Sequence, residues 1–171
     1  RVVDPWGEPL DGKGALHALE HYPLYPDVLN PMARNAVNKP MPVGVRTIDS
    51  LLTAGEGQRL AIMAGSGVGK STLLGMMARN SEADVKVIAL IGERSREVRH
   101  FVEQDLGEEG LKKSVVIAAT SNTAAALRIR AARAATAIAE YYRDQGLRVL
   151  LLMDSLTRVC MAQRELGLST G

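Results

Sequence analysis

The sequence predicts an α/β domain built on a doubly wound, mostly parallel sheet. Short aliphatic runs alternate with longer helical stretches from residue 43 onward, and this alternation is typical of such a domain. The aliphatic runs are continuous, as expected of parallel strands that are buried on both faces. The chain has 171 residues, which is the length of one ordinary domain with a sizeable core.

The pattern indicates four strands and three helices in the second part of the chain. We expect strands at 59–64, 85–91, 114–119 and 148–153, and helices at 71–79, 95–106 and 123–144. The last helix contains nine alanines between Ala124 and Ala139, and such small side chains let a helix lie close to a sheet. Its arginines are interpreted as a solvated face, with a contact to another subunit as the alternative; they are Arg128, Arg130 and Arg133.

The first 42 residues differ in composition from the rest. They hold all seven prolines and three of the six aromatic residues. Proline fixes φ and lacks a backbone donor, so this segment is not expected to form a regular helix or a central strand. We therefore divide the chain into a proline-rich connector at 1–42 and a core domain at 43–171.

Charge and cysteine content exclude several classes of protein. Lys and Arg together number 21 against 19 Asp and Glu, and a net charge of +2 does not by itself indicate a nucleic-acid or membrane-surface binder. Apolar runs in the sequence fall well short of the roughly 20 residues of a membrane span. The single cysteine, Cys160, excludes an internal disulfide framework and fits a reducing compartment. We expect this thiol to be buried and inert.

The strongest local motif is a glycine-rich loop that precedes the first predicted helix. It runs through Gly65, Ser66, Gly67, Val68, Gly69, Lys70, Ser71 and Thr72. Glycines allow a close backbone approach, so several N–H groups can converge on phosphate oxygens, and the helix N-terminus adds its dipole. Lys70 would contact the β and γ phosphates, and the Ser71 hydroxyl would bind Mg²⁺. The motif therefore predicts an ATP/ADP site.

Acidic residues follow two of the predicted strands. Asp154 ends an aliphatic run, at the edge where ligands bind in parallel sheets, and can hold Mg²⁺ through water. Glu93 follows another run and can orient the attacking water beside the γ-phosphate. Arg94 would counter charge on the transferring group, and Glu97, one helical turn on, would contact water bound to Mg²⁺. For Glu93 and Glu97, the alternative is a helix N-terminus that merely favours acidic residues.

Three motifs in this order, AGSGVGKST, GERSREVRHF and LLLMDSLTR, resemble the RecA-like catalytic subunits of rotary ATPases. REVRHF, ATAIAEYYRDQG and the tail MDSLTRVCMAQRELGLSTG are most similar to the type III secretion and flagellar export ATPases. The resemblance implies a RecA-like P-loop core with Lys70, Ser71 and Asp154 around phosphate and Mg²⁺. It further implies Glu93 as the catalytic carboxylate, Arg94 and Glu97 as supporting residues, and Arg158 near the γ-phosphate.

The same resemblance implies a function. Such proteins hydrolyse ATP, with Mg²⁺, to drive protein unfolding and export from a hexameric ring. Their partners are stalk and regulator proteins, export chaperones and cargo proteins; the resemblance implies no nucleic acid and no membrane span. It also implies a cytoplasmic location, peripheral to the inner membrane.

Residues 1–14 resemble the junction between a preceding barrel domain and the core. We expect the core to be incomplete at its C-terminal end. The family's trans-acting arginine and adenine contacts would then lie outside this chain, so the isolated chain should be a weak ATPase.

Two other functions remain open from the sequence. A non-catalytic nucleotide-binding subunit would keep the phosphate loop but lack the catalytic carboxylate, so Glu93 argues against it. A hexameric RNA translocase has the same core. The balanced charge and only three aromatic residues after Tyr25 offer no stacking platform or basic groove for RNA.

Overall fold

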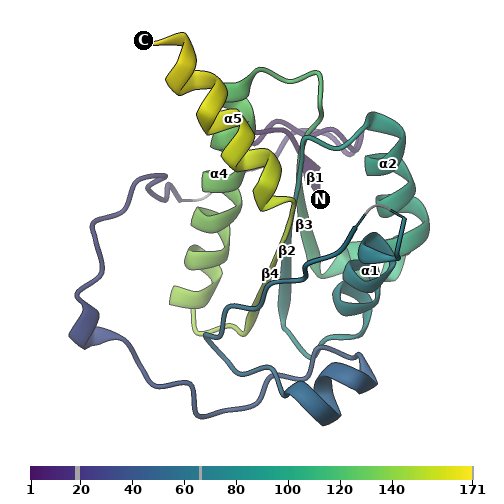
Figure 1. The fold of residues 1–171 in the computed structure, drawn as a ribbon, viewed down its shortest axis with the longest axis vertical. Coiled ribbons are helices and arrows are strands. Elements are labelled where there is room, and N and C mark those ends of the chain that lie inside the picture. Colours follow the sequence, from purple (N-terminus) through teal and green to yellow (C-terminus); the bar gives the residue numbers. More distant parts are fainter. Residues whose placement is uncertain (18–19, 66, 171) are drawn as a thin grey trace.

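The computed structural model describes residues 1–17, 20–65 and 67–170. Within these ranges, four parallel strands form one sheet in the order β1-β3-β2-β4 (Figure 1). The strands are β1 (Val2–Val3), β2 (Val85–Ile91), β3 (Ser114–Ala119) and β4 (Val149–Asp154). The predicted parallel α/β fold is therefore confirmed, with β2 and β3 at the predicted residues.

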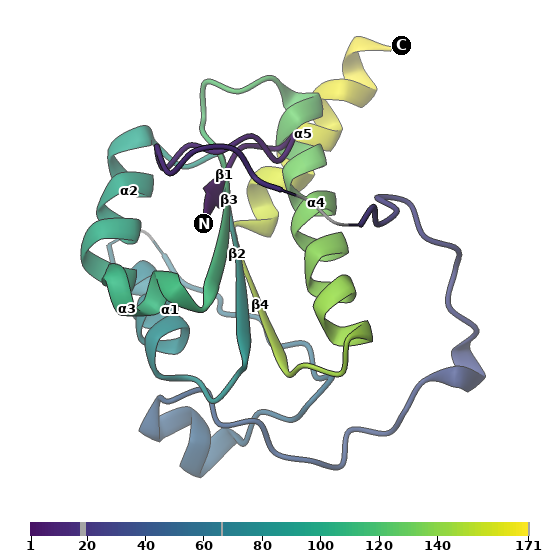
Figure 2. The same cartoon turned by 180° about the vertical axis from the view of Figure 1, so that it is seen from behind.

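Helices cover both faces of this sheet (Figures 1 and 2). One face carries α1 (Lys70–Asn80), α2 (Ser95–His100), the π-helical segment η3 (Phe101–Leu106) and α3 (Gly107–Lys112). The other carries α4 (Ala125–Asp144) and α5 (Leu156–Ser169). Two further short segments, η1 (Pro31–Ala33) and η2 (Ile48–Leu52), belong to the long connection between β1 and α1. Each helix of the described residues is too short or too polar to cross a lipid bilayer.

The core consists of two apolar clusters, one on each face of the sheet. Alternate residues of β2 face opposite ways: Ile88 joins the cluster beside α1 and η3, whereas Ala89 joins the cluster beside α4. The α4 side of the second cluster consists of alanines, including Ala131 and Ala135, both with no exposed surface. The alanine content of α4 thus lets the helix lie directly against the sheet, as predicted.

The prediction of a strand at 59–64 is wrong. This segment is irregular chain, and its side chains are largely exposed, with Met63 at 92%. A strand needs a hydrogen-bonded neighbour, because an isolated extended segment is not stable in water. Within the described ranges, the outer edge of β4 has no paired strand and 59–64 does not lie on it. Hydrophobicity alone was therefore not sufficient to make this run a strand.

The helical predictions differ from the structure mainly at the ends. The helix expected at 95–106 is α helical only to His100 and continues as the wider turn of η3. The prediction contained no counterpart of β1, α3, α5 or the short segments η1 and η2. Of the described residues of α5, only Ala162 is buried. Cys160 is consequently exposed, and the expectation of a buried thiol is wrong.

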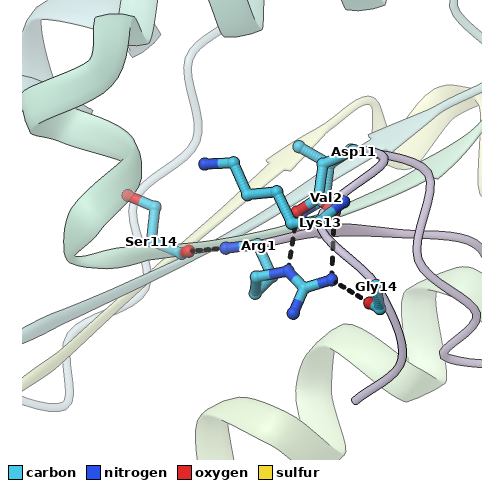
Figure 3. Close-up of polar contacts among 6 residues, drawn as sticks. All are labelled: Arg1, Val2, Asp11, Lys13, Gly14 and Ser114. Atoms are coloured by element: carbon cyan, nitrogen blue, oxygen red, sulfur yellow. Dashed lines mark hydrogen bonds and ion pairs between the residues drawn. The ribbon is translucent and has the colours of Figure 1, made fainter.

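The start of the chain is attached to the core by polar contacts around Asp11 (Figure 3). The carboxylate of Asp11 accepts hydrogen bonds from the Arg1 guanidinium at 2.8 and 3.0 Å and from the Val2 N–H at 3.0 Å. The Arg1 contact holds the pKa of Asp11 far below its ordinary value. The backbone nitrogen of Arg1 also donates to the Ser114 carbonyl at 2.9 Å. These contacts hold β1 beside β3.

Aromatic residues of the N-terminal segment stack on the arginines of α4. The Arg130 guanidinium lies 4.0 Å from the ring centre of Trp6, and Arg133 lies 4.2 Å from that of Tyr25. Cation–π contacts of this kind are favourable because the ring face is electronegative. The arginines were predicted as a solvated face, and this is wrong for Arg130, which also donates to the Pro5 carbonyl at 3.0 Å.

Candidate active site

The functional residues of three separate motifs meet at the carboxyl edge of the sheet. Strand register places Asp154, the last residue of β4, opposite Leu90 of β2. Glu93 follows two residues after the end of β2, and Lys70 is the first residue of α1. Ligands bind above the carboxyl ends of parallel strands in open α/β sheets. The topology therefore assembles the predicted site from distant parts of the sequence.

The described residues of the phosphate loop before Lys70 are exposed, and the loop leads into the N-terminus of α1. Gly67 and Gly69 adopt φ values of +75° and +96°, which other residues rarely tolerate. The first intrahelical hydrogen bond at this end runs from the Leu73 N–H to the Gly69 carbonyl at 2.9 Å. The N–H groups of Lys70, Ser71 and Thr72 thus have no partner within the helix and suit an anion. Ser66, also predicted to bind phosphate, lies outside the described residues.

Lys70 donates a hydrogen bond to Asp154 and forms an ion pair with it. The side chain of Asp154 is only 6% exposed, whereas that of Lys70 is 31% exposed. The pair joins the first residue of α1 to the last residue of β4, so two of the three predicted motifs are in direct contact. Lys70 and Asp154 therefore bind each other in this structure.

Glu93 is half-buried at the same edge. Burial raises the pKa of its carboxyl, and a hydrogen bond with Glu97 and the negative charge of Asp154 act in the same direction. The charge of Lys70 opposes this shift. A carboxyl with a raised pKa beside a phosphate site is a candidate for proton transfer or for holding a water.

Glu97 and Arg94 lie at the N-terminus of α2. Glu97 accepts a hydrogen bond from the Arg94 N–H at 3.2 Å, and the two side chains form an ion pair at 3.5 Å. The hydrogen bond with Glu93 holds the pKa of Glu97 below its ordinary value, and the Arg94 N–H contributes. Glu97 therefore gives up its proton more readily than Glu93 does. The Arg94 side chain is 67% exposed and contacts Glu97, so a role for it at the phosphate stays a prediction.

Arg158, on the first turn of α5, passes close to the backbone of Gly92. A Cβ built on Gly92 would lie 3.0 Å from both Cβ and Cγ of Arg158, and Gly92 has a φ of +72°. Glycine is required here both for the backbone turn and for the approach of the arginine. Gly92 directly precedes Glu93, so Arg158 and Glu93 lie at the same turn. Sequence reasoning missed Gly92, although a glycine between a buried run and an acidic residue is a signal for such a turn.

The residues at this edge fit a nucleotide with magnesium. Within the described ranges, no three His, Cys, Asp or Glu side chains gather closely enough to hold a metal by themselves. A hydroxyl from Ser71 and the carboxylate of Asp154 are nevertheless the hard oxygen donors that Mg²⁺ takes, and Mg²⁺ in such sites keeps several waters and phosphate oxygens. The N–H groups at the start of α1 are suited to phosphate contacts.

Two hollows of the surface lie away from this edge. They measure about 220 and 440 Å³ and run along α4 and β4, and neither is lined by a described residue of the phosphate loop. Their linings include Thr136 and Glu140 of α4, together with Leu151 or Met153 of β4. We assign the site from its chemistry, because the hollows contain none of the predicted residues.

Comparison with known proteins shows a nucleotide-binding family. The nucleotide-binding domain model of the ATP synthase alpha/beta family matches residues 44–171. The flagellum-specific ATP synthase of Bacillus subtilis (strain 168) is 58% identical over the whole chain, and the type 3 secretion system ATPase of Xanthomonas euvesicatoria is 56% identical. The chain spans 39% of the length of each of these relatives.

Solved structures show the same fold. The assembled ATPase EscN in complex with its central stalk EscO, from the type III secretion system of enteropathogenic E. coli, superposes with a TM-score of 0.93. That chain is 48% identical, and the match covers all of this chain and 42% of the other. A prototypical ATPase from the type III secretion system of pathogenic bacteria gives a TM-score of 0.93 at 47% identity, with 49% of that chain covered.

Proposed function

The chain belongs to the ATP synthase alpha/beta family, and we propose that it is the catalytic portion of an ATPase that powers protein export. The observation that carries this proposal is the meeting of Lys70, Asp154 and Glu93 at one sheet edge beside the N-terminus of α1. The similar proteins are named as flagellar ATP synthases and type 3 secretion ATPases, which supports export as the use of the energy. Neither the RNA translocase nor the non-catalytic subunit is favoured by these names.

The residues have distinct roles in this proposal. The backbone N–H groups from Gly67 to Thr72 hold the phosphates, and Lys70 leaves Asp154 to contact the β and γ phosphates. The Ser71 hydroxyl and the Asp154 carboxylate hold Mg²⁺, which supplies neutralising charge when it is bound. Glu93 orients the attacking water and takes its proton, and Glu97 keeps Glu93 in place. Arg158 would stabilise charge on the transferring group.

We also place the chain in a ring of like subunits with a central stalk, as the EscN–EscO structure supports for that protein. Regulators, chaperones and cargo proteins would then meet the ring outside the residues described here, in the cytoplasm at the inner membrane. The arginine that a neighbouring subunit contributes in this family would be needed for full turnover. The isolated chain should accordingly hydrolyse ATP slowly.

The test uses the protein that carries this chain at its natural length. Lys70→Ala should weaken ATP binding and lower turnover, because it removes the charge at the phosphates. Glu93→Gln should keep Mg²⁺–ATP binding but lower kcat about 10²- to 10⁴-fold, the range for a lost general base. Glu103→Gln, at an exposed position of η3, is the matched control and should hydrolyse ATP normally. Near-normal hydrolysis by Glu93→Gln would refute the assignment of Glu93.

A further inference from the structure

Arg128 lies at the start of α4 and contacts two other parts of the chain at once. Its Nε donates to the Thr123 carbonyl at 3.1 Å, and its Nη2 donates to Glu165 of α5 at 2.6 Å. The Arg128 side chain is only 15% exposed, so it is largely withdrawn from water. A guanidinium can make both bonds because its donors lie in a rigid planar fork. The interpretation of Arg128 as part of a solvated face is therefore wrong.

The Thr123 carbonyl belongs to the turn that connects β3 to α4. This turn is closed by the Thr123 N–H, which donates to the Thr120 carbonyl at 2.9 Å, and the two threonine hydroxyls are 3.4 Å apart. Arg128 holds the peptide that ends the turn. Movement of this peptide would therefore also move Ser121, which lies within the turn.

Ser121 fixes the backbone of the proposed catalytic residue. Its N–H donates to the Glu93 carbonyl at 3.0 Å, and the Gly92 N–H donates to the Ala119 carbonyl at 2.6 Å. The pairing of β2 with β3 thus continues beyond both strand ends, as far as Glu93. Glu93 is thus bonded to the turn at Thr120–Thr123, and that turn is bonded to Arg128.

The other bond of Arg128 reaches the helix that follows Asp154. Glu165 lies on α5 two helical turns after Arg158, and α5 begins directly after Asp154 and its cap residue Ser155. The Ser155 hydroxyl accepts from the Arg158 N–H at 3.4 Å at that end. A single side chain therefore connects the loop that holds Glu93 with the helix that carries Arg158.

We infer that Arg128 is a positioning residue, which keeps Glu93 and Arg158 at a fixed separation by joining the β3–α4 turn to α5. This inference rests on the proposed function. Positioning of a reacting group within about 1 Å is worth up to about 10²-fold in rate. Loss of the connection should accordingly lower kcat while the phosphate loop, which Arg128 does not touch, still binds nucleotide.

The test compares Arg128→Lys with Arg164→Lys in the protein at its natural length. Lysine keeps the charge, but its donors radiate from one nitrogen and lack the planar fork of a guanidinium, so it cannot hold Thr123 and Glu165 in the same geometry. Arg164 is an exposed neighbour of Glu165 on α5, so its variant is the matched control. For Arg128→Lys we expect kcat about 10- to 100-fold lower with KM within about threefold of the unmodified protein. We expect the control to match the unmodified protein.

A second measurement separates positioning from general loss of structure. Hydrogen exchange of the Ser121 N–H, which bonds to the Glu93 carbonyl, should become faster in Arg128→Lys, whereas exchange within β2 should stay slow. Glu165→Gln keeps a hydrogen-bond acceptor for Arg128 and should lose less activity than Arg128→Lys. An unchanged kcat in Arg128→Lys would overturn the inference. Changes in kcat and KM that accompany a general fall in Tm and uniformly faster hydrogen exchange would overturn it as well.

The two proposals can fail separately. An unmodified protein that does not hydrolyse ATP would refute the proposed function, and the Ser121 exchange would still test whether Arg128 holds the turn. An unmodified protein that hydrolyses ATP, together with a fully active Arg128→Lys variant, would refute the role of Arg128 alone.

Discussion

The Lys70–Asp154 contact predicts an unusual response to Asp154→Asn. Both residues are proposed to bind substrate, Lys70 through phosphate and Asp154 through Mg²⁺, yet here they bind each other. Nucleotide without Mg²⁺ must therefore break the pair, and gains nothing from the released carboxylate. Nucleotide with Mg²⁺ gives each partner a new contact. Replacing Asp154 by Asn should thus affect the two forms of nucleotide in opposite directions.

The size of the effect follows from the exposure of the two side chains. Exposed ion pairs contribute up to about 1 kcal/mol, and hydrogen bonds between charged groups about 1.5–3 kcal/mol. With Lys70 31% exposed and Asp154 6% exposed, we take an intermediate value of about 1–2 kcal/mol, or about 5- to 30-fold in an equilibrium constant. Asn keeps an oxygen acceptor but no charge, so we expect Mg²⁺-free nucleotide to bind about 5- to 10-fold more tightly to Asp154→Asn.

Nucleotide with Mg²⁺ should bind about 10-fold more weakly to Asp154→Asn, because a residue that orients the waters of a metal typically contributes 10- to 100-fold to metal affinity. Titration of ATP with Mg²⁺ and with a chelator, by calorimetry, gives both constants. Asp84→Asn is the control, since Asp84 pairs with Arg148 at the opposite end of the sheet. Equal weakening under both conditions would show a fold defect and refute the reasoning.

Two further predictions concern the turn that carries Glu93. Gly92→Ala and Gly146→Ala should each lower the free energy of unfolding by about 1–2 kcal/mol, because both glycines have positive φ. Only Gly92→Ala should also lower kcat, because its Cβ would meet Arg158. Denaturant unfolding and steady-state rates distinguish the two effects, and equal activity of the two variants would contradict the contact. Glu97→Gln should lower the pKa of Glu93 by removing its anionic hydrogen-bond partner, so the acid limb of the kcat–pH profile should move to lower pH. An unchanged acid limb of the profile would show that Glu97 does not influence the pKa of Glu93.

The strands that sequence predicted best are those with neighbours on both sides. Val85–Ile91 and Ser114–Ala119 were predicted at their observed bounds, because both are continuous aliphatic runs in the interior of the sheet. Residues 59–64 carry a similar run but lack a paired neighbour within the described ranges. An apolar run indicates that a segment is suited to burial. Whether it pairs with a strand depends on which edge of the sheet the rest of the chain presents to it. That property is not local to the run.

The members of the proposed site could be named from the sequence, whereas their contacts could not. Lys70 and Asp154 were identified because residue type and position at an element's end are local features of the sequence. Their pairing, across 84 residues, is set by the order of the strands. Arg128 was misassigned for the same reason, because helical spacing alone does not show that Thr123 and Glu165 meet its two sides.

Strand register also gives the two site carboxylates different depths, and hence different chemistry. Asp154 lies opposite Leu90, within the paired part of the sheet, and only 5% of it is exposed. Glu93 lies three residues beyond Leu90, and three residues of extended chain would carry it about 10 Å away. The positive φ of Gly92 bends the chain instead, and the charges of Asp154 and Lys70 still act on the pKa of Glu93. One glycine therefore brings a deep carboxylate and an outer one to the same edge of the sheet, as the proposed phosphate site requires.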